Sequence, residues 1–268
     1  MTVTRAGAGT AATWRRLTGP TAAVLLVAVA AWVGVVVLSR GMTAMPGTMG
    51  LTFGAFAGIW ALMMTAMMLP TIAPFTALYT RTFTDRRFRR TAALACGYLL
   101  VWTAAAIPAY ALARVTEYLV DQHPTAATVL AVLVFTAAGV YQLTPIKDRC
   151  LARCRSPLGF VMAYGGYRGR LRDLRVGASH GAFCLACCWA LMAVLVTVGS
   201  MNLVAMVAIA ATVLAEKTTT WGPRLTRVIG VVALVFAIAV AIRPSLVTGL
   251  QSGPTGPDTG MTGGPMTS

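Results

Sequence analysis

The sequence predicts an all-α protein, a polytopic membrane helix bundle of about seven transmembrane helices with a cytoplasmic N-terminus. Only 11% of its 268 residues are charged and the mean hydropathy is +0.75, whereas a globular chain is about 25% charged. The charged residues bound long apolar runs, and the positive ones fall mainly in alternate loops. These observations exclude a soluble enzyme.

Four apolar stretches in the first half of the chain each hold one predicted span. A bilayer core of about 30 Å requires about 20 apolar residues per helix. Residues 17–39 hold the first span, and residues 41–80 hold the second together with a loop. Residues 91–113 and 122–146 hold the third and fourth.

The second half of the chain holds three more predicted spans. Residues 176–215 have room for two helices, which the turn-like tetrapeptide at residues 199–202 would separate. Residues 225–242 are short but sufficient for a span without tilt. The total is seven spans in one membrane domain, residues 17–243.

The basic residues predict the orientation of this domain. With a cytoplasmic N-terminal segment at residues 1–16, 19 of the 22 Lys and Arg residues lie inside, eight of them in a basic loop at residues 147–175. This distribution explains the net charge of +15 as membrane orientation, so the expected partner is the lipid bilayer and we expect no nucleic acid. Residues 244–268 are rich in Gly, Pro, Thr and Ser and predict a disordered extracytoplasmic tail.

Three cysteines and a histidine share one face of the fifth predicted span. His180, Cys184, Cys187 and Cys188 fall within an arc of about 100° at helical spacing. Thiolates and imidazole are the usual ligands of Cu(I) and Zn(II). Because His180 and Cys188 are about 12 Å apart along the axis, two or three of the four could share one ion, with other ligands from another helix.

Methionines of the second predicted span are candidates for those other ligands. Met63, Met64, Met67 and Met68 have helical spacing, and the predicted topology places them at the depth of Cys184 and Cys188. Thioethers bind Cu(I) and are poor ligands for Zn(II), so the sequence favours copper(I), with zinc as the alternative. Ordinary packing is the competing interpretation of a methionine stripe.

Three further groups have a possible functional and a simpler structural interpretation. Cys150 and Cys154, in the basic loop, are either a cytoplasmic hand-off site for the metal or incidental. The Glu216-Lys217 pair is interpreted as a self-paired or snorkelling pair at the interface, with an ion or proton role as the alternative. Glycines at every fourth position, Gly50, Gly54 and Gly58, predict close packing with another helix, in a homo-oligomer or a membrane-complex partner.

Several motifs occur in sequence between residues 66 and 203. They are Ala66-Met67-Met68-Leu69-Pro70, residues 97–102, residues 141–147 followed by Cys150 and residues 154–157, His180-Gly181 through Cys184 to Cys187-Cys188-Trp189, and Met201-Asn202-Leu203. In this order they resemble a bacterial family of predicted metal-binding integral membrane proteins, domain of unknown function 2182, over roughly residues 50 to 220.

The resemblance implies a metal bound by the same Cys and His residues, in a multi-pass protein of the bacterial cytoplasmic membrane. It names no substrate, transport direction or reaction. Where the family has a glycine before the paired cysteines, this chain has Ala186, which alters packing but removes no candidate ligand.

Three functional hypotheses follow. The first is a non-catalytic copper-binding membrane protein that acts in copper uptake, storage or delivery to a membrane metalloenzyme. The second is an intramembrane oxidoreductase in which Cys184 and Cys187 exchange electrons with a quinone, although the predicted orientation places this dithiol toward the reducing side. The third is an accessory or structural subunit of a membrane enzyme complex.

Overall fold

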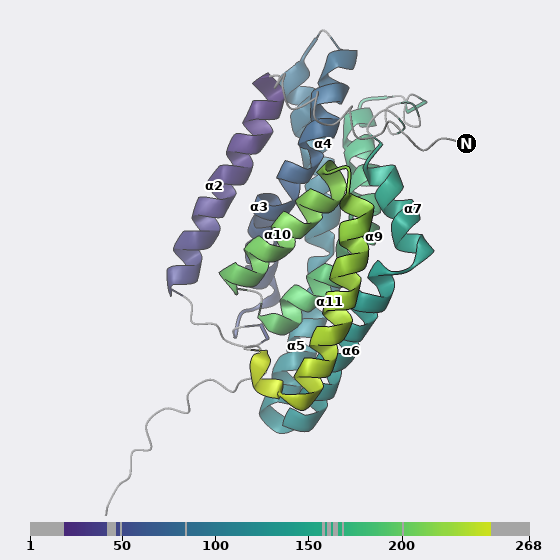
Figure 1. Cartoon of the computed structure of the whole chain (residues 1–268). Coiled ribbons are helices and arrows are strands. Elements are labelled where there is room, and N and C mark those ends of the chain that lie inside the picture. The colour runs from purple at the N-terminus through teal and green to yellow at the C-terminus, as the bar shows by residue number, and fades with distance from the viewer. Residues whose placement is uncertain are drawn as a thin grey trace, which may run out of the picture.

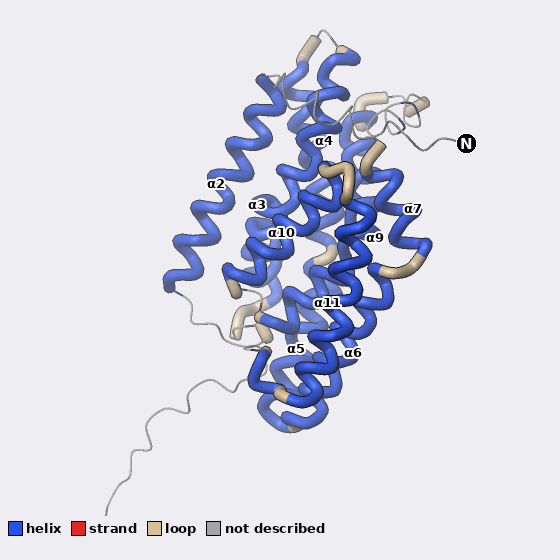
Figure 2. Tube along the Cα trace, viewed as in Figure 1, coloured by secondary structure: helices blue, strands red, loops and turns tan. Residues whose placement is uncertain are grey.

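The computed structural model describes residues 19–41, 47–48, 50–83, 85–156, 159, 162, 166–167, 169–199 and 201–247. The predicted N-terminal segment at residues 1–16 lies outside this part of the chain, as does the predicted tail beyond residue 247. The regular secondary structure of the described residues is entirely helical, as predicted (Figures 1 and 2).

The helices form an elongated bundle (Figure 1). In chain order they are α2 (Gly19–Gly41), α3 (Phe53–Tyr79), η1 (Thr80–Thr82), α4 (Arg87–Ala104), α5 (Ala106–Gln122), α6 (Pro124–Gln142), α7 (Pro145–Cys154), α9 (Arg172–Val198), α10 (Leu203–Thr218), α11 (Gly222–Ile242) and η2 (Pro244–Leu246).

Six helical stretches among the described residues are long and apolar enough to cross a membrane. They are α2, α3 with η1, α4 with α5, α6, α9 and α11. The sixth predicted span corresponds to α10, which with 16 residues is shorter than the about 20 residues of an ordinary span.

The third predicted span differs from the structure in length and in continuity. The sequence predicts one helix within residues 91–113, but the helical stretch Arg87–Gln122 has 36 residues and is divided at Ala105 into α4 and α5. Pro108 explains the break, because proline has no N–H for the carbonyl of Ala104 and its ring clashes with that carbonyl. The break leaves α4 as a separate helix beside α9.

The predicted turn between the fifth and sixth spans is confirmed. Helix α9 ends at Val198, and Gly199 has a φ of 116°, a conformation that side chains other than glycine rarely adopt. The side chain of Asn202 then accepts a hydrogen bond from the N–H of Ala205 and caps α10. As a result α10 returns along α9 with almost no loop.

Glycines bring α4 and α9 into backbone contact. A Cβ atom on Gly177 of α9 would lie 1.9 Å from the carbonyl oxygen of Leu94, and one on Gly97 of α4 would lie 2.0 Å from that of Leu174. Only glycine fits at these two positions. This contact fixes the side chains that follow on both helices, including Tyr98 on α4 and Cys184 on α9.

The predicted partner surface at Gly50, Gly54 and Gly58 is not used within the described part of the chain. A Cβ atom at any of these positions would meet nothing within 4 Å. Large apolar side chains are also exposed along α2, α6 and α11, for example Leu26, Leu133 and Ile238. Exposed apolar surface of this extent suits a lipid environment.

Candidate metal centre

The predicted ligand face of α9 points into the bundle. His180, Cys184, Cys187 and Cys188 are all buried, and the Sγ atoms belong to free thiols. The helical spacing therefore places all four side chains on the interior side, as the sequence indicated. Side chains of α3, α4, α7 and α10 pack against this face and complete the site.

Four thiols interact in series from the bundle interior to α7. The thiol of Cys188 interacts with those of Cys184 and Cys187 on the same helix, and Cys187 also interacts with that of Cys154 on α7. Cys150 and Cys154 of α7 are only partly buried. Helix α7 starts at Pro145, and its first turn is capped by the hydroxyl of Thr144, which accepts a hydrogen bond from the N–H of Lys147.

Lys217 of α10 lies directly against this series. Its Nζ atom is 2.7 Å from the Sγ of Cys184 and 3.4 Å from the Oγ1 of Thr71 on α3. The side chain is 94% buried. Its interpretation as half of a self-paired interfacial pair with Glu216 is therefore wrong.

Glu216 pairs with a different lysine. Its Oε2 atom is 2.8 Å from the Nζ of Lys147 on α7, and its Oε1 accepts a hydrogen bond of 2.9 Å from Gln142. Lys147 also donates to the carbonyl of Cys187 at 2.8 Å. Burial by itself lowers the pKa of Lys147, but Cys187, Cys188 and Glu216 raise that pKa above its usual range. Lys147 therefore carries its charge and holds α7 against α9 and α10.

The sequence contained a signal for two of these three charged residues, because ionisable groups beside apolar spans are costly and commonly functional. Consecutive residues of a helix do not face one another, since each step turns the helix by about 100°. Glu216 and Lys217 therefore point to different neighbours. Which neighbours these are depends on contacts between distant segments. Lys147 carries no sequence signal of its own, because it is one of eight Lys and Arg residues at positions 147–175.

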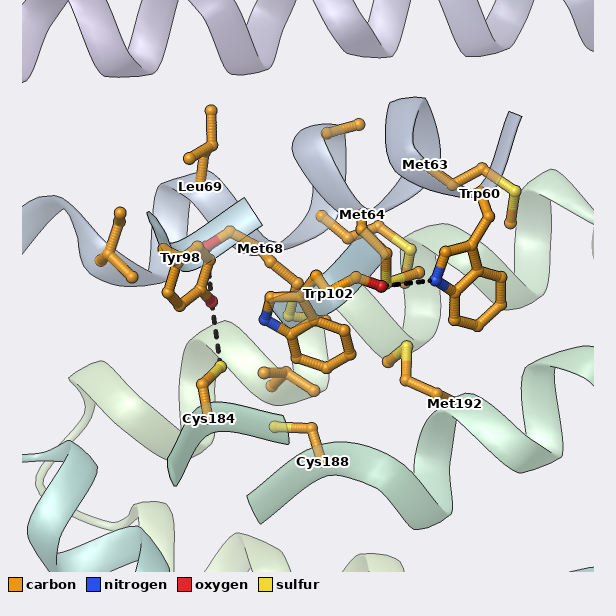
Figure 3. Close-up of a cluster of buried hydrophobic side chains, with 14 of the residues drawn as sticks. Trp60, Met63, Met64, Met68, Leu69, Tyr98, Trp102, Cys184, Cys188 and Met192 are labelled. Carbon is orange, nitrogen blue, oxygen red and sulfur yellow. Dashed lines mark hydrogen bonds between the residues drawn. The ribbon is translucent and has the colours of Figure 1, made fainter. Parts of the chain in front are cut away.

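The four methionines of α3 are buried in the same core cluster as the three cysteines of α9. Figure 3 shows Tyr98 and Trp102 of α4 between Met64 and Met68 on one side and Cys184 and Cys188 on the other. The hydroxyl of Tyr98 is 2.9 Å from the Sγ of Cys184 and 3.4 Å from the carbonyl oxygen of Met68. Tyr98 thus connects the methionine helix to the cysteine helix.

His180 occupies an aromatic environment near the start of the ligand face. Its ring stacks on that of Phe75 of α3 at a centroid distance of 4.7 Å, and the ring of Tyr98 lies 5.9 Å away. His180 is one helical turn before Cys184, so it is separated from Cys188 by two turns, as the spacing indicated.

Among the described residues there is no group of three or more His, Cys, Asp and Glu side chains that could hold a metal ion. The pair of interacting thiols at Cys184 and Cys188 has the soft donor chemistry that suits Cu(I).

Comparison with known proteins places the chain in a family. No curated protein and no solved structure matches it. The model of the family PpoB2, described as a copper chaperone, matches residues 57–240. This range includes the four methionines of α3, all six cysteines, Lys147 and Lys217. Because the match covers more than half of the chain, the protein belongs to the copper chaperone family PpoB2.

Proposed function

We propose that this protein is an integral membrane copper chaperone, which holds Cu(I) on buried thiols and delivers it to a recipient such as a membrane metalloenzyme. The observation that carries the proposal is the series of thiols from Cys184 through Cys188 and Cys187 to Cys154. Together with membership of a copper chaperone family, this series supports both binding and onward transfer.

Cu(I) is the cargo that best fits these ligands. A soft monovalent ion is satisfied by two or three sulfur ligands, whereas a structural zinc site needs four ligands in a tetrahedron. Cys184 and Cys188 are the first pair of copper ligands in this proposal. His180, one helical turn before Cys184, packs beside them and is not a ligand of this pair. The methionines of α3 supply thioethers on the opposite side of Tyr98, where they receive copper before the thiols do.

Transfer along the thiols proceeds by ligand exchange without any change in the oxidation state of copper. As a Cu–S bond to Cys187 forms, the bond to Cys184 breaks; the incoming thiol loses a proton and the released sulfur gains one. The same exchange brings copper to Cys154 on the partly exposed α7, with Cys150 beside it as a further hand-off ligand. With the N-terminus inside, this hand-off occurs on the cytoplasmic side of the bacterial membrane.

A Cu(I) titration of the purified protein in mild detergent, against a chromophoric Cu(I) chelator, tests the proposal. We expect near-stoichiometric copper on the wild type and its loss in a Cys184→Ser/Cys188→Ser variant. Cys96→Ser is the matched control, because Cys96 is an exposed thiol on α4 and its removal should leave binding unchanged. A wild type without stoichiometric copper, or a double variant that binds as the wild type does, would falsify the proposal.

A further inference from the structure

The buried charges around the thiols do not balance within the described residues. Lys147 and Glu216 neutralise each other at 2.8 Å. The other ion pairs in this part of the chain join Arg90 to Asp173 and Arg114 to Glu117, so Lys217 has no carboxylate partner there. It is nevertheless 94% buried.

A buried ammonium group is costly unless a negative charge lies close to it. Among the described residues, the ammonium group of Lys217 donates hydrogen bonds to the hydroxyl of Thr71 and to the sulfur of Cys184. The phenol hydroxyl of Tyr98 also contacts this sulfur, and the thiol of Cys188 interacts with it. The group in contact with Lys217 that can become anionic when it binds a metal ion is therefore the sulfur of Cys184.

We propose that Lys217 is a specificity-determining residue, which makes this pair of thiols select a monovalent soft cation over a divalent one. The inference rests on the proposed binding of Cu(I) at Cys184 and Cys188. A monovalent ion on two thiolates forms a centre of charge −1, which the charge of Lys217 neutralises. A divalent ion on the same thiolates forms a neutral centre and leaves the buried Lys217 uncompensated.

The residues around the two thiols favour a bound ion that leaves the sulfur centre with a charge of −1. A third thiolate would restore neutrality around a divalent ion, but Cys184, Cys187 and Cys188 do not form a group of three that could hold one ion in the described part of the chain. Glu216 cannot supply a carboxylate, because it faces Lys147 and Gln142 on another side of α10. The charge of Lys217 therefore stabilises a monovalent ion on the two thiolates more than a divalent ion on the same thiolates.

The test compares Cu(I) and Zn(II) affinities of the full chain in detergent, each measured by competition with a chelator of known affinity. Lys217→Met removes the charge and keeps much of the volume. We expect Cu(I) affinity to fall by about 30-fold or more, as for truncation of one partner of a buried charge pair, and Zn(II) affinity to stay the same or rise. Lys217→Arg, which keeps the charge, should retain the wild-type preference.

Thr71→Val is the matched control, because it removes the other hydrogen-bonding partner of Lys217 without changing any charge. Its ratio of Cu(I) to Zn(II) affinity should stay within about threefold of the wild type, the effect of one ordinary hydrogen bond. If Lys217→Met is not recovered as a folded monodisperse protein, Lys217→Gln tests the same loss of charge with a polar side chain.

The possible results separate this inference from the function on which it rests. An unchanged affinity ratio in a folded uncharged variant, or a higher Cu(I) affinity, overturns the role of Lys217 while copper binding itself stands. A wild-type protein that binds no Cu(I) overturns the proposed function. A ratio that falls in the uncharged variants and is retained in Lys217→Arg supports the inference.

Discussion

Single residues of the site are held in place by charges kept away from water. The ion pair between Lys147 and Glu216 joins α7 to α10, and Lys147 also holds the carbonyl of Cys187. Both charged groups are almost completely buried, so removal of either one would leave the other charge in the interior without a counter-charge.

Loss of one partner of this pair should be more harmful than loss of both. Lys147→Met leaves the Glu216 carboxylate buried without a cation, and we expect a cost of about 3–5 kcal/mol of stability. The double variant Lys147→Met/Glu216→Gln contains no unpaired charge and should recover most of that loss. Thermal unfolding in detergent measures both; equal melting temperatures of the single and double variants would contradict this account.

At the scale of helices, the contact between α4 and α9 determines the geometry of the site. Gly177→Ala would place a Cβ atom 1.9 Å from the carbonyl oxygen of Leu94, so the helices must separate. We expect destabilisation at the upper end of the about 1–3 kcal/mol that is typical of overpacking, together with weaker Cu(I) binding, because Tyr98 moves away from Cys184. Thermal unfolding and Cu(I) competition measure the two effects.

Gly58→Ala is the control for this substitution, since a Cβ atom there meets nothing within 4 Å. It should leave stability the same or slightly higher, as expected for Gly to Ala in a helix. A Gly177→Ala protein as stable as Gly58→Ala would show that the close contact is not required.

Helix α3 provides a separate test of the thioether ligands. Replacement of Met63, Met64, Met67 and Met68 by Leu conserves volume, so the fold should survive. We expect Cu(I) affinity to fall by more than about twofold, since leucine offers copper no donor. If affinity stays within that factor while Cys188→Ser abolishes binding, the methionine stripe is core packing and the site belongs to the cysteines alone.

At the scale of the molecule, two basic segments of the described residues lie toward the same end of the bundle. In Figure 1 the connection between α3 and α4 lies toward the same end as α7, whereas the connection between α5 and α6 lies at the opposite end. Both the α3–α4 connection and α7 are basic, with Arg81 and Arg86 in the first and Arg149 and Arg153 in the second.

Which side of the membrane this basic end faces is a prediction of the positive-inside rule. A membrane-impermeant thiol reagent should label Cys150 and Cys154 in inverted vesicles and leave them unlabelled in intact cells. Cys150→Ser/Cys154→Ser shows how much of the signal comes from the other thiols. Labelling of these two residues from outside would reverse the orientation and return the dithiol alternative to consideration.

Hydropathy and helical spacing predicted the parts of this structure that depend on local sequence. Runs of apolar residues located the helices, and the spacing from His180 to Cys188 placed four side chains on one buried face. The break at Ala105 also had a local cause, in Pro108. The contact of Lys217 with Cys184 has no local cause in the sequence. It joins residues 33 positions apart on two helices, and packing sets the relative rotation of those helices.

X-ray absorption at the copper edge of the Cu(I)-loaded protein tests the central claim, that copper is held by the buried sulfur atoms, most directly. We predict a coordination shell of sulfur alone in the wild type, and loss of bound copper in Cys184→Ser/Cys188→Ser with the Cys96→Ser control unchanged. A shell dominated by nitrogen or oxygen, or a sulfur shell that survives removal of Cys184 and Cys188, would contradict the account.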